Sequence, residues 1–177
     1  MNQQFLESYC RLQNGITIFP SHDKAIDQVL ADLVSQIPAH LVLLTDTTGQ
    51  LISAQGNRGK IDLVALGVLM AGELAASQEI ARLTAEHQDY QMIMREGQRS
   101  HIFISEAGRH LALLTKVSHD VPLGWVRMLV QRSARRLADI IAMPPEEAES
   151  SDLVLSQDDK KGLPDLIGDA LKNLWLE

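Results

Sequence analysis

Apolar residues occupy every side of a predicted helix at residues 63–83, LVALGVLMAGELAASQEIARL. The segment contains helix-favouring residues and no proline, and Asp62 is placed to cap its first turn. No charged residue occurs between Leu63 and Gly72. Because a surface helix normally has one apolar stripe and one polar face, we expect this helix to be covered on more than one side. On a helical wheel, the face with the largest side chains consists of Leu63, Leu66, Met70 and Leu74.

Small residues at a spacing of four, Gly67, Ala71 and Ala75, form a row along this helix. Such a row lets another backbone approach closely. Two interpretations stay open: a central helix buried within one domain, or a helix that lies on its own sheet and pairs with its copy in a homodimer. We do not expect membrane insertion, because the segment reaches only about 30 Å and charged residues begin at Glu73.

Hydrophobic periodicity before the central helix predicts a helix and a hairpin. The helix is expected from Ser21, with Ser21 or Asp23 as its N-cap, and Pro38 ends it. Two apolar runs, at 41–45 and 51–54, are joined by the glycine-containing stretch DTTGQ, which favours a hairpin.

Three apolar runs and an amphipathic helix follow the central helix. The runs predict strands in meander order at residues 90–95, 101–105 and 109–116. Pro122 opens the amphipathic helix, and Pro144 ends it. The expected fold class is therefore α/β (α+β), with a five-stranded antiparallel sheet and helices on both faces.

The length of 177 residues favours one domain with appendages. We expect a weakly patterned N-terminal lead-in at 1–20 and the domain itself at 21–143. An acidic, serine-rich stretch at 144–161 is typical of a flexible linker, and we expect residues 162–177 to form an amphipathic C-terminal helix.

Charge and cysteine content narrow the class of protein. The net charge of −7 argues against nucleic acid as a main partner, since phosphate binding needs a basic surface. A single cysteine, Cys10, cannot form an internal disulfide, and the first residues lack a signal-peptide pattern. We therefore expect a cytoplasmic protein.

No catalytic constellation is visible in the sequence. Ser-His-Asp occurs at 21–23 and at 118–120, but residues adjacent in sequence cannot form a triad, so we interpret both as turn or cap residues. The histidines lack metal-ligand spacing, although His101 and His110 could be neighbours on paired strands. The loop at 56–61 lacks the spacing of a phosphate loop. We predict no catalytic, cofactor-binding or metal-binding residues, and therefore no enzyme.

The element order and the apolar central helix resemble the Roadblock/LC7 family. The resemblance covers residues 25–142 and rests on LVLLTDTTGQLISAQG, on the central helix, and on EGQRSHIFISEAGRHLALLTKVSHDVPLGWVRMLVQRSARRLADI. Within the family the chain is most similar to the bacterial MglB-type regulators of cell polarity and gliding motility.

The resemblance implies a profilin-like sandwich that forms a homodimer. The central helices would lie side by side, and the strand at 90–95 would pair with its copy, which also covers an otherwise open sheet edge. The candidate dimer contacts are Gly67, Ala71, Ala75, Tyr90, Met92 and Met94.

The resemblance also implies that the paired helices bind a small Ras-like, MglA-like GTPase and stimulate GTP hydrolysis by reshaping its switch loops. The candidate docking residues are Val64, Val68, Ala71, Gly72, Ala75 and Glu79. An arginine finger is the other route to activation, but none of the candidates lies in an evident finger loop. These candidates are Arg58, Arg82, Arg127, Arg132 and Arg135.

Three other functions remain open at this point. The chain could be a scaffold or adaptor that anchors a GTPase or another complex without changing its turnover, as eukaryotic Roadblock relatives do in dynein and in lysosomal signalling complexes. A small-molecule sensor of PAS or GAF type is disfavoured by the lack of convergent polar groups in the apolar core. An enzyme with its own chemistry has the least support.

Overall fold

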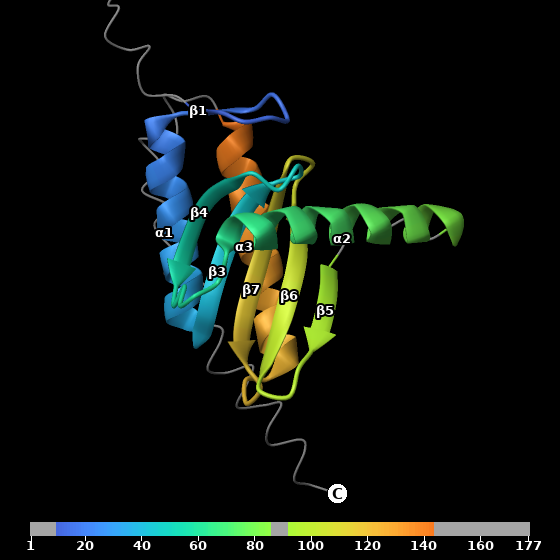
Figure 1. The fold of residues 1–177 in the computed structure, drawn as a ribbon. Helices are drawn as coiled ribbons and strands as arrows, with labels where there is room; N and C mark the ends of the chain where they lie inside the picture. The colour runs from blue at the N-terminus through green and yellow to red at the C-terminus, as the bar shows by residue number, and fades with distance from the viewer. Residues whose placement is uncertain (1–9, 86–91, 144–177) are drawn as a thin grey trace, which may run out of the picture.

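The computed structural model describes residues 10–85 and 92–143. Figure 1 shows a five-stranded antiparallel sheet with α1 and α3 on one face and α2 across the other. The predicted α/β (α+β) sandwich is confirmed. The predicted linker at 144–161 and C-terminal helix at 162–177 lie outside the described residues, so they stay predictions, as do the domain boundaries.

The sheet has the strand order β4-β3-β7-β6-β5, and every neighbouring pair is antiparallel. The last three strands in sequence form the predicted meander. Arg109 and His110 precede β7 in the turn, so this strand starts two residues later than expected. The strands are β3 (Ala39–Asp46), β4 (Leu51–Gly56), β5 (Met92–Glu96), β6 (Ser100–Ala107) and β7 (Leu111–Ser118).

The first helix, α1 (Pro20–Gln36), begins one residue before the predicted start. The prediction of Ser21 or Asp23 as N-cap is wrong, because Phe19 holds the cap position and makes no side-chain cap hydrogen bond. Proline suits the first helical position, since its fixed φ fits the helix and the N–H it lacks would have no partner there.

A short hairpin precedes α1 and belongs to the core of the domain. Its strands are β1 (Cys10–Arg11) and β2 (Thr17–Ile18). Leu12 and Ile18 are buried in the same cluster as the apolar face of α1. The hairpin therefore closes one end of the layer formed by α1 and α3 (Leu123–Ala142).

Alternating strand residues enter two separate cores, as the two-residue period of a strand requires. In β3, Val42 and Leu44 face α1 and α3, whereas Leu43 faces α2. The sheet is thus covered on both faces, which explains the continuous apolar run in this strand. The smaller core beneath α2 consists of Leu43, Ala54, Met70, Leu74, Ile104, Ala112 and Leu114.

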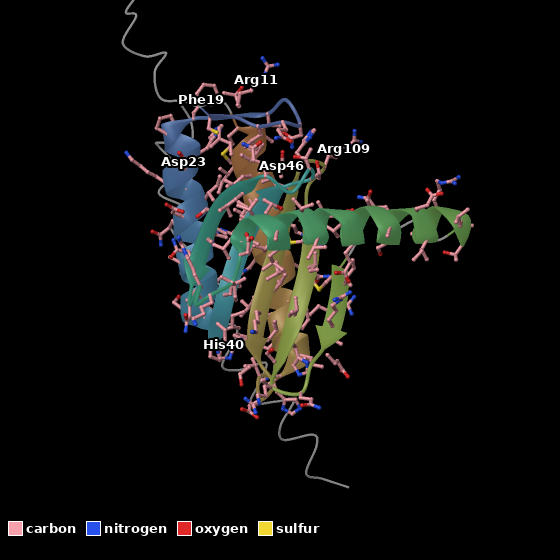
Figure 2. All side chains as sticks on the ribbon, in the orientation of Figure 1. Arg11, Phe19, Asp23, His40, Asp46 and Arg109 are labelled. Carbon is pink, nitrogen blue, oxygen red and sulfur yellow. The ribbon has the colours of Figure 1, made fainter. Side chains whose placement is uncertain are left out.

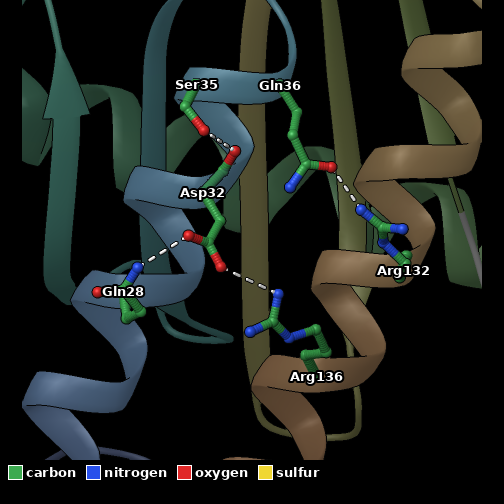
Figure 3. Close-up of polar contacts among 6 residues, drawn as sticks. All are labelled: Gln28, Asp32, Ser35, Gln36, Arg132 and Arg136. Carbon is green, nitrogen blue, oxygen red and sulfur yellow. Dashed lines mark hydrogen bonds and ion pairs between the residues drawn. The ribbon is translucent and has the colours of Figure 1, made fainter. Parts of the chain in front are cut away.

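Polar contacts join α1 to α3 along their solvent-facing seam (Figure 3). Arg136 Nη1 lies 3.3 Å from Asp32 Oδ2, and Gln28 Nε2 donates to the other carboxylate oxygen at 2.8 Å. Arg132 donates to the Gln36 side chain. Arg132 therefore holds two helices of this chain together and is engaged on the face opposite α2.

Candidate partner-binding surface

The central helix, α2 (Leu63–Leu83), has the bounds that its sequence predicts. Asp62 Oδ1 accepts hydrogen bonds from the backbone N–H groups of Val64 (3.1 Å) and Ala65 (3.0 Å), which confirms it as the N-cap. At the other end the Thr84 hydroxyl donates to the Ile80 carbonyl at 2.9 Å. Both ends of α2 are therefore defined by local hydrogen bonds.

One side of α2 packs on the sheet. Met70 and Leu74 are buried in the smaller core, and Leu63 and Leu66 pack at its margin. This is the face predicted from the helical wheel. Gly67 and Ala71 lie on the same side and are also buried.

The close backbone approach expected along the row of small residues occurs within the chain. A Cβ atom at Gly67 would lie 2.6 Å from the carbonyl oxygen of Gly49 and 3.1 Å from Thr45 Cγ2. Gly49 has φ +92°, and a Cβ there would lie 2.7 Å from the Cα of Val68. The turn between β3 and β4 therefore sits directly on α2, and both glycines are required for this contact.

The remaining sides of α2 expose large apolar side chains. The exposed fractions are Val64 63%, Val68 56%, Leu69 71%, Ile80 62% and Leu83 70%. Figure 1 shows that α2 crosses the strands and that its C-terminal part extends beyond β5. Among residues 10–85 and 92–143, only the sheet-facing side of α2 is covered, so this part of the chain does not supply the predicted cover on its further sides. Contiguous exposed apolar surface is typical of an interaction site.

The same helix is long and apolar enough, by length and composition alone, to cross a membrane. Its buried residues pack on the sheet of this chain. Two ion pairs mark its polar positions. Arg95 Nε donates to Glu73 Oε1 at 2.8 Å and links β5 to α2. Arg82 binds both carboxylate oxygens of Glu79, at 2.8 and 2.6 Å, and this hydrogen bonding lowers the pKa of Glu79.

Strand β5 leaves one edge of the sheet open, since among the described strands it pairs only with β6. Met92 is half-buried against the larger core, whereas Met94 is 43% exposed. An open edge presents unpaired backbone groups to any further strand. The open edge and the projecting part of α2 lie on the same side of the molecule (Figure 1).

The predicted contact residues differ in their exposure. Exposed positions are Val64, Val68, Gly72, Ala75, Glu79 and Met94. Gly67 and Ala71 are buried inside the chain, Met92 is half-buried, and Tyr90 lies outside the described residues. The assignment of these residues to a GTPase or to a second copy stays a prediction. The contact residues predicted from the sequence do not include Leu69, Ile80 and Leu83, although the helical wheel shows apolar residues on every side of α2.

A groove of about 470 Å³ lies between α2 and the turn that joins β6 to β7. On the α2 side it is lined by Ala71, Leu74, Ala75 and Gln78. Thr47, Glu106, Gly108 and Arg109 complete it. Gln78 donates to the Glu106 carboxylate across the groove. The sequence does not predict this groove, because three segments far apart in the chain form it.

The predicted proximity of His101 and His110 is wrong. His101 pairs across from Val117, whereas His110 lies in the turn at the opposite end of β6 and β7. The ring of His101 instead lies 5.2 Å from that of His119. Among residues 10–85 and 92–143 no three His, Cys, Asp or Glu side chains are grouped as metal ligands. Ser118 donates to Asp120 Oδ2 at 3.2 Å in a turn, as expected for that Ser-His-Asp sequence.

Several solved structures are similar to this fold. MglB from Myxococcus xanthus is 29% identical with a TM-score of 0.63, over 66% of this chain and 94% of that one. The gliding protein MglB of Thermus thermophilus is 26% identical with a TM-score of 0.66, over 72% and 96%. A Roadblock/LC7 domain from Streptomyces avermitilis has a TM-score of 0.60 at 14% identity, over 66% and 98%, and supports the fold alone. No family model and no curated protein matches the sequence.

Proposed function

We propose that this chain, which has an MglB-like Roadblock/LC7 fold, is a homodimeric regulator of a small Ras-like GTPase in the cytoplasm. The observation that carries the proposal is the exposed apolar side of α2 beside the open edge of β5. A surface of this kind is typical of a binding site for another protein, and the likeness to MglB indicates which kinds of partner to test.

A second copy fits the β5 side of this surface. Antiparallel pairing of β5 with its copy would satisfy the open backbone groups and bring the two projecting α2 helices together. Ile80 and Leu83 lie near the C-terminal end of α2 and are exposed in one chain. The second copy would then cover them. The paired helices would form one continuous apolar platform.

The GTPase would bind on this platform through the exposed apolar residues of α2. Val64, Val68 and Ala75 belong to this surface, whereas Ala71 is too buried to contribute much. Activation would come from reshaping of the switch loops of the GTPase, with the chemistry left to its own residues. Two candidate finger arginines on the α2 side already have acceptors: Arg58 donates to the Ala54 carbonyl at 2.7 Å, and Arg82 binds Glu79.

The test is GTP hydrolysis by a Ras-like GTPase from the same genome, measured with and without this protein, together with its mass in solution. A dimer that accelerates hydrolysis at substoichiometric amounts supports the activator. A dimer that binds the GTPase without acceleration means that the chain is a scaffold. A monomer that does neither contradicts the proposal.

Two matched variants test whether α2 forms the surface that binds the partner. Leu69→Glu places a charge on the exposed side of α2, and we expect it to reduce dimerisation or GTPase binding at least tenfold while the fold keeps its stability. Met128→Glu makes the same change at a half-exposed position of α3, on the other face of the sheet, and should leave both measurements unchanged. Equal effects of the two variants would contradict the assignment to α2.

A further inference from the structure

We propose that the groove between α2 and the β6–β7 turn receives an acidic side chain of the GTPase, with Arg109 as its counter-ion. The inference rests on the proposed function and adds a specificity-determining residue to it. The group that binds is a carboxylate, carried on a surface of the GTPase that also contacts the apolar side of α2.

The shape of the groove suits an inserted side chain. Ala71, Leu74 and Ala75 contribute small and medium apolar side chains to its lining. Gln78 and Arg109 contribute polar groups to the same lining. A partner that lies along α2 would therefore meet the groove without leaving the apolar surface.

The backbone that carries Arg109 is fixed on both sides. Gly108 has φ +69°, and a Cβ atom there would lie 2.9 Å from the Cβ of Ala138, so the turn sits tightly on α3. The His110 carbonyl accepts hydrogen bonds from the Thr47 N–H (3.0 Å) and from Asn14 Nδ2 (2.9 Å). A fixed backbone lowers the conformational entropy lost when the side chain binds a partner.

Among the residues that line the groove, Arg109 is the cation whose donors are left for an incoming carboxylate. Glu106 already accepts a hydrogen bond from Gln78, whereas Arg109 has no ion pair or hydrogen-bond acceptor among residues 10–85 and 92–143. Figure 2 shows Arg109 at the end of the sheet next to α2. Arg82 and Arg95, also on the α2 side, are each bound to a glutamate.

Arginine is well matched to this role. Its guanidinium group binds a carboxylate through two parallel hydrogen bonds, which sets the orientation of the partner as well as its affinity. A phosphate group binds a guanidinium in the same bidentate way, so the test below separates the two by the maximal hydrolysis rate. We expect the contact to position the GTPase rather than to reach its nucleotide.

The test compares Arg109→Ala, Arg109→Lys and Arg109→Glu in the full-length protein, using the GTP-bound Ras-like GTPase as the probe. We expect Arg109→Ala to weaken binding about tenfold and Arg109→Glu to weaken it further. Arg109→Lys keeps the charge but loses the paired hydrogen bonds, so its affinity should lie between those of the wild type and Arg109→Ala. The maximal hydrolysis rate at saturation should stay the same. Arg99→Glu is the matched control, because Arg99 is an exposed arginine in the β5–β6 turn, at the opposite end of the sheet.

A charge exchange identifies the partner residue. One Asp→Lys or Glu→Lys variant of the GTPase should restore binding to Arg109→Glu and weaken binding to the wild type. Unchanged affinity of Arg109→Ala, with wild-type binding intact, would overturn this inference and leave the proposed function in place. A lower maximal rate at saturation would also overturn it, since Arg109 would then act on the nucleotide. Absence of binding by the wild-type protein would contradict the proposed function itself.

Discussion

The contact between Gly67 and Gly49 leads to a prediction about two glycines of α2, Gly67 and Gly72. Substitution by alanine should change the free energy of unfolding in opposite directions at these two positions. At Gly67 the added methyl group would lie 2.6 Å from a backbone oxygen. At Gly72 it would meet nothing within 4 Å. The gain in helix propensity is about 1 kcal/mol at either site, so the difference between the two variants measures the packing contact alone.

The expected magnitude follows from these distances. Overpacking of a tight site costs about 1–3 kcal/mol, and the upper part of that range applies where the neighbour is backbone that cannot rotate away. After subtraction of the propensity gain, Gly67→Ala should lower the free energy of unfolding by about 1–2 kcal/mol. Gly72→Ala should raise it by about 1 kcal/mol.

Urea denaturation followed by circular dichroism measures both values, and the slope of each transition shows whether unfolding stays two-state. The measurement should be repeated at two protein concentrations, because a second copy could also contact Gly72. Equal stability of the two variants, or a stabilising Gly67→Ala, would refute the packing argument.

Two further predictions concern helix ends. Asp62→Ala removes the acceptor of two backbone N–H groups at the start of α2 and should lower the free energy of unfolding by about 1 kcal/mol. The same denaturation assay measures this loss. An unchanged free energy of unfolding would mean that water replaces the cap. The pKa of Asp23 is raised by burial and by the nearby charge of Asp27, so the folded state binds this proton more tightly than the unfolded state does. The ionised form therefore destabilises the fold as the pH rises above the ordinary value of 3.8, and Asp23→Asn should stabilise the protein at pH 7 but not at pH 3. A gain that is the same at both pH values would contradict this assignment.

Features set by neighbouring residues could be predicted from the sequence. The bounds of α2, its cap at Asp62 and its sheet-facing side follow from propensity, a local hydrogen bond and helical period. The strand order of the meander follows from short connections. The N-cap of α1 is the local exception, because Pro20 occupies the first helical position and moves the cap to Phe19.

Features that depend on packing between distant segments could not be predicted. The small-residue row indicates a close backbone contact, but the sequence does not reveal that the approaching backbone is Gly49 of the same chain. The position of Arg109 beside α2 depends on the packing of a turn against α3 and against the β3–β4 turn. The predicted neighbour of His101 is wrong for a related reason, since the apolar pattern does not fix the register of β6 on β7.

The two sides of α2 have separate roles in the molecule. Gly67, Met70 and Leu74 hold the helix on its sheet, so changes there threaten folding itself. Leu69 and Ile80 contribute little to the single-chain fold and can diverge without loss of the domain. A duplicated copy of such a gene can therefore acquire a new recognition code through the outer side of one helix, while the scaffold beneath it is inherited unchanged.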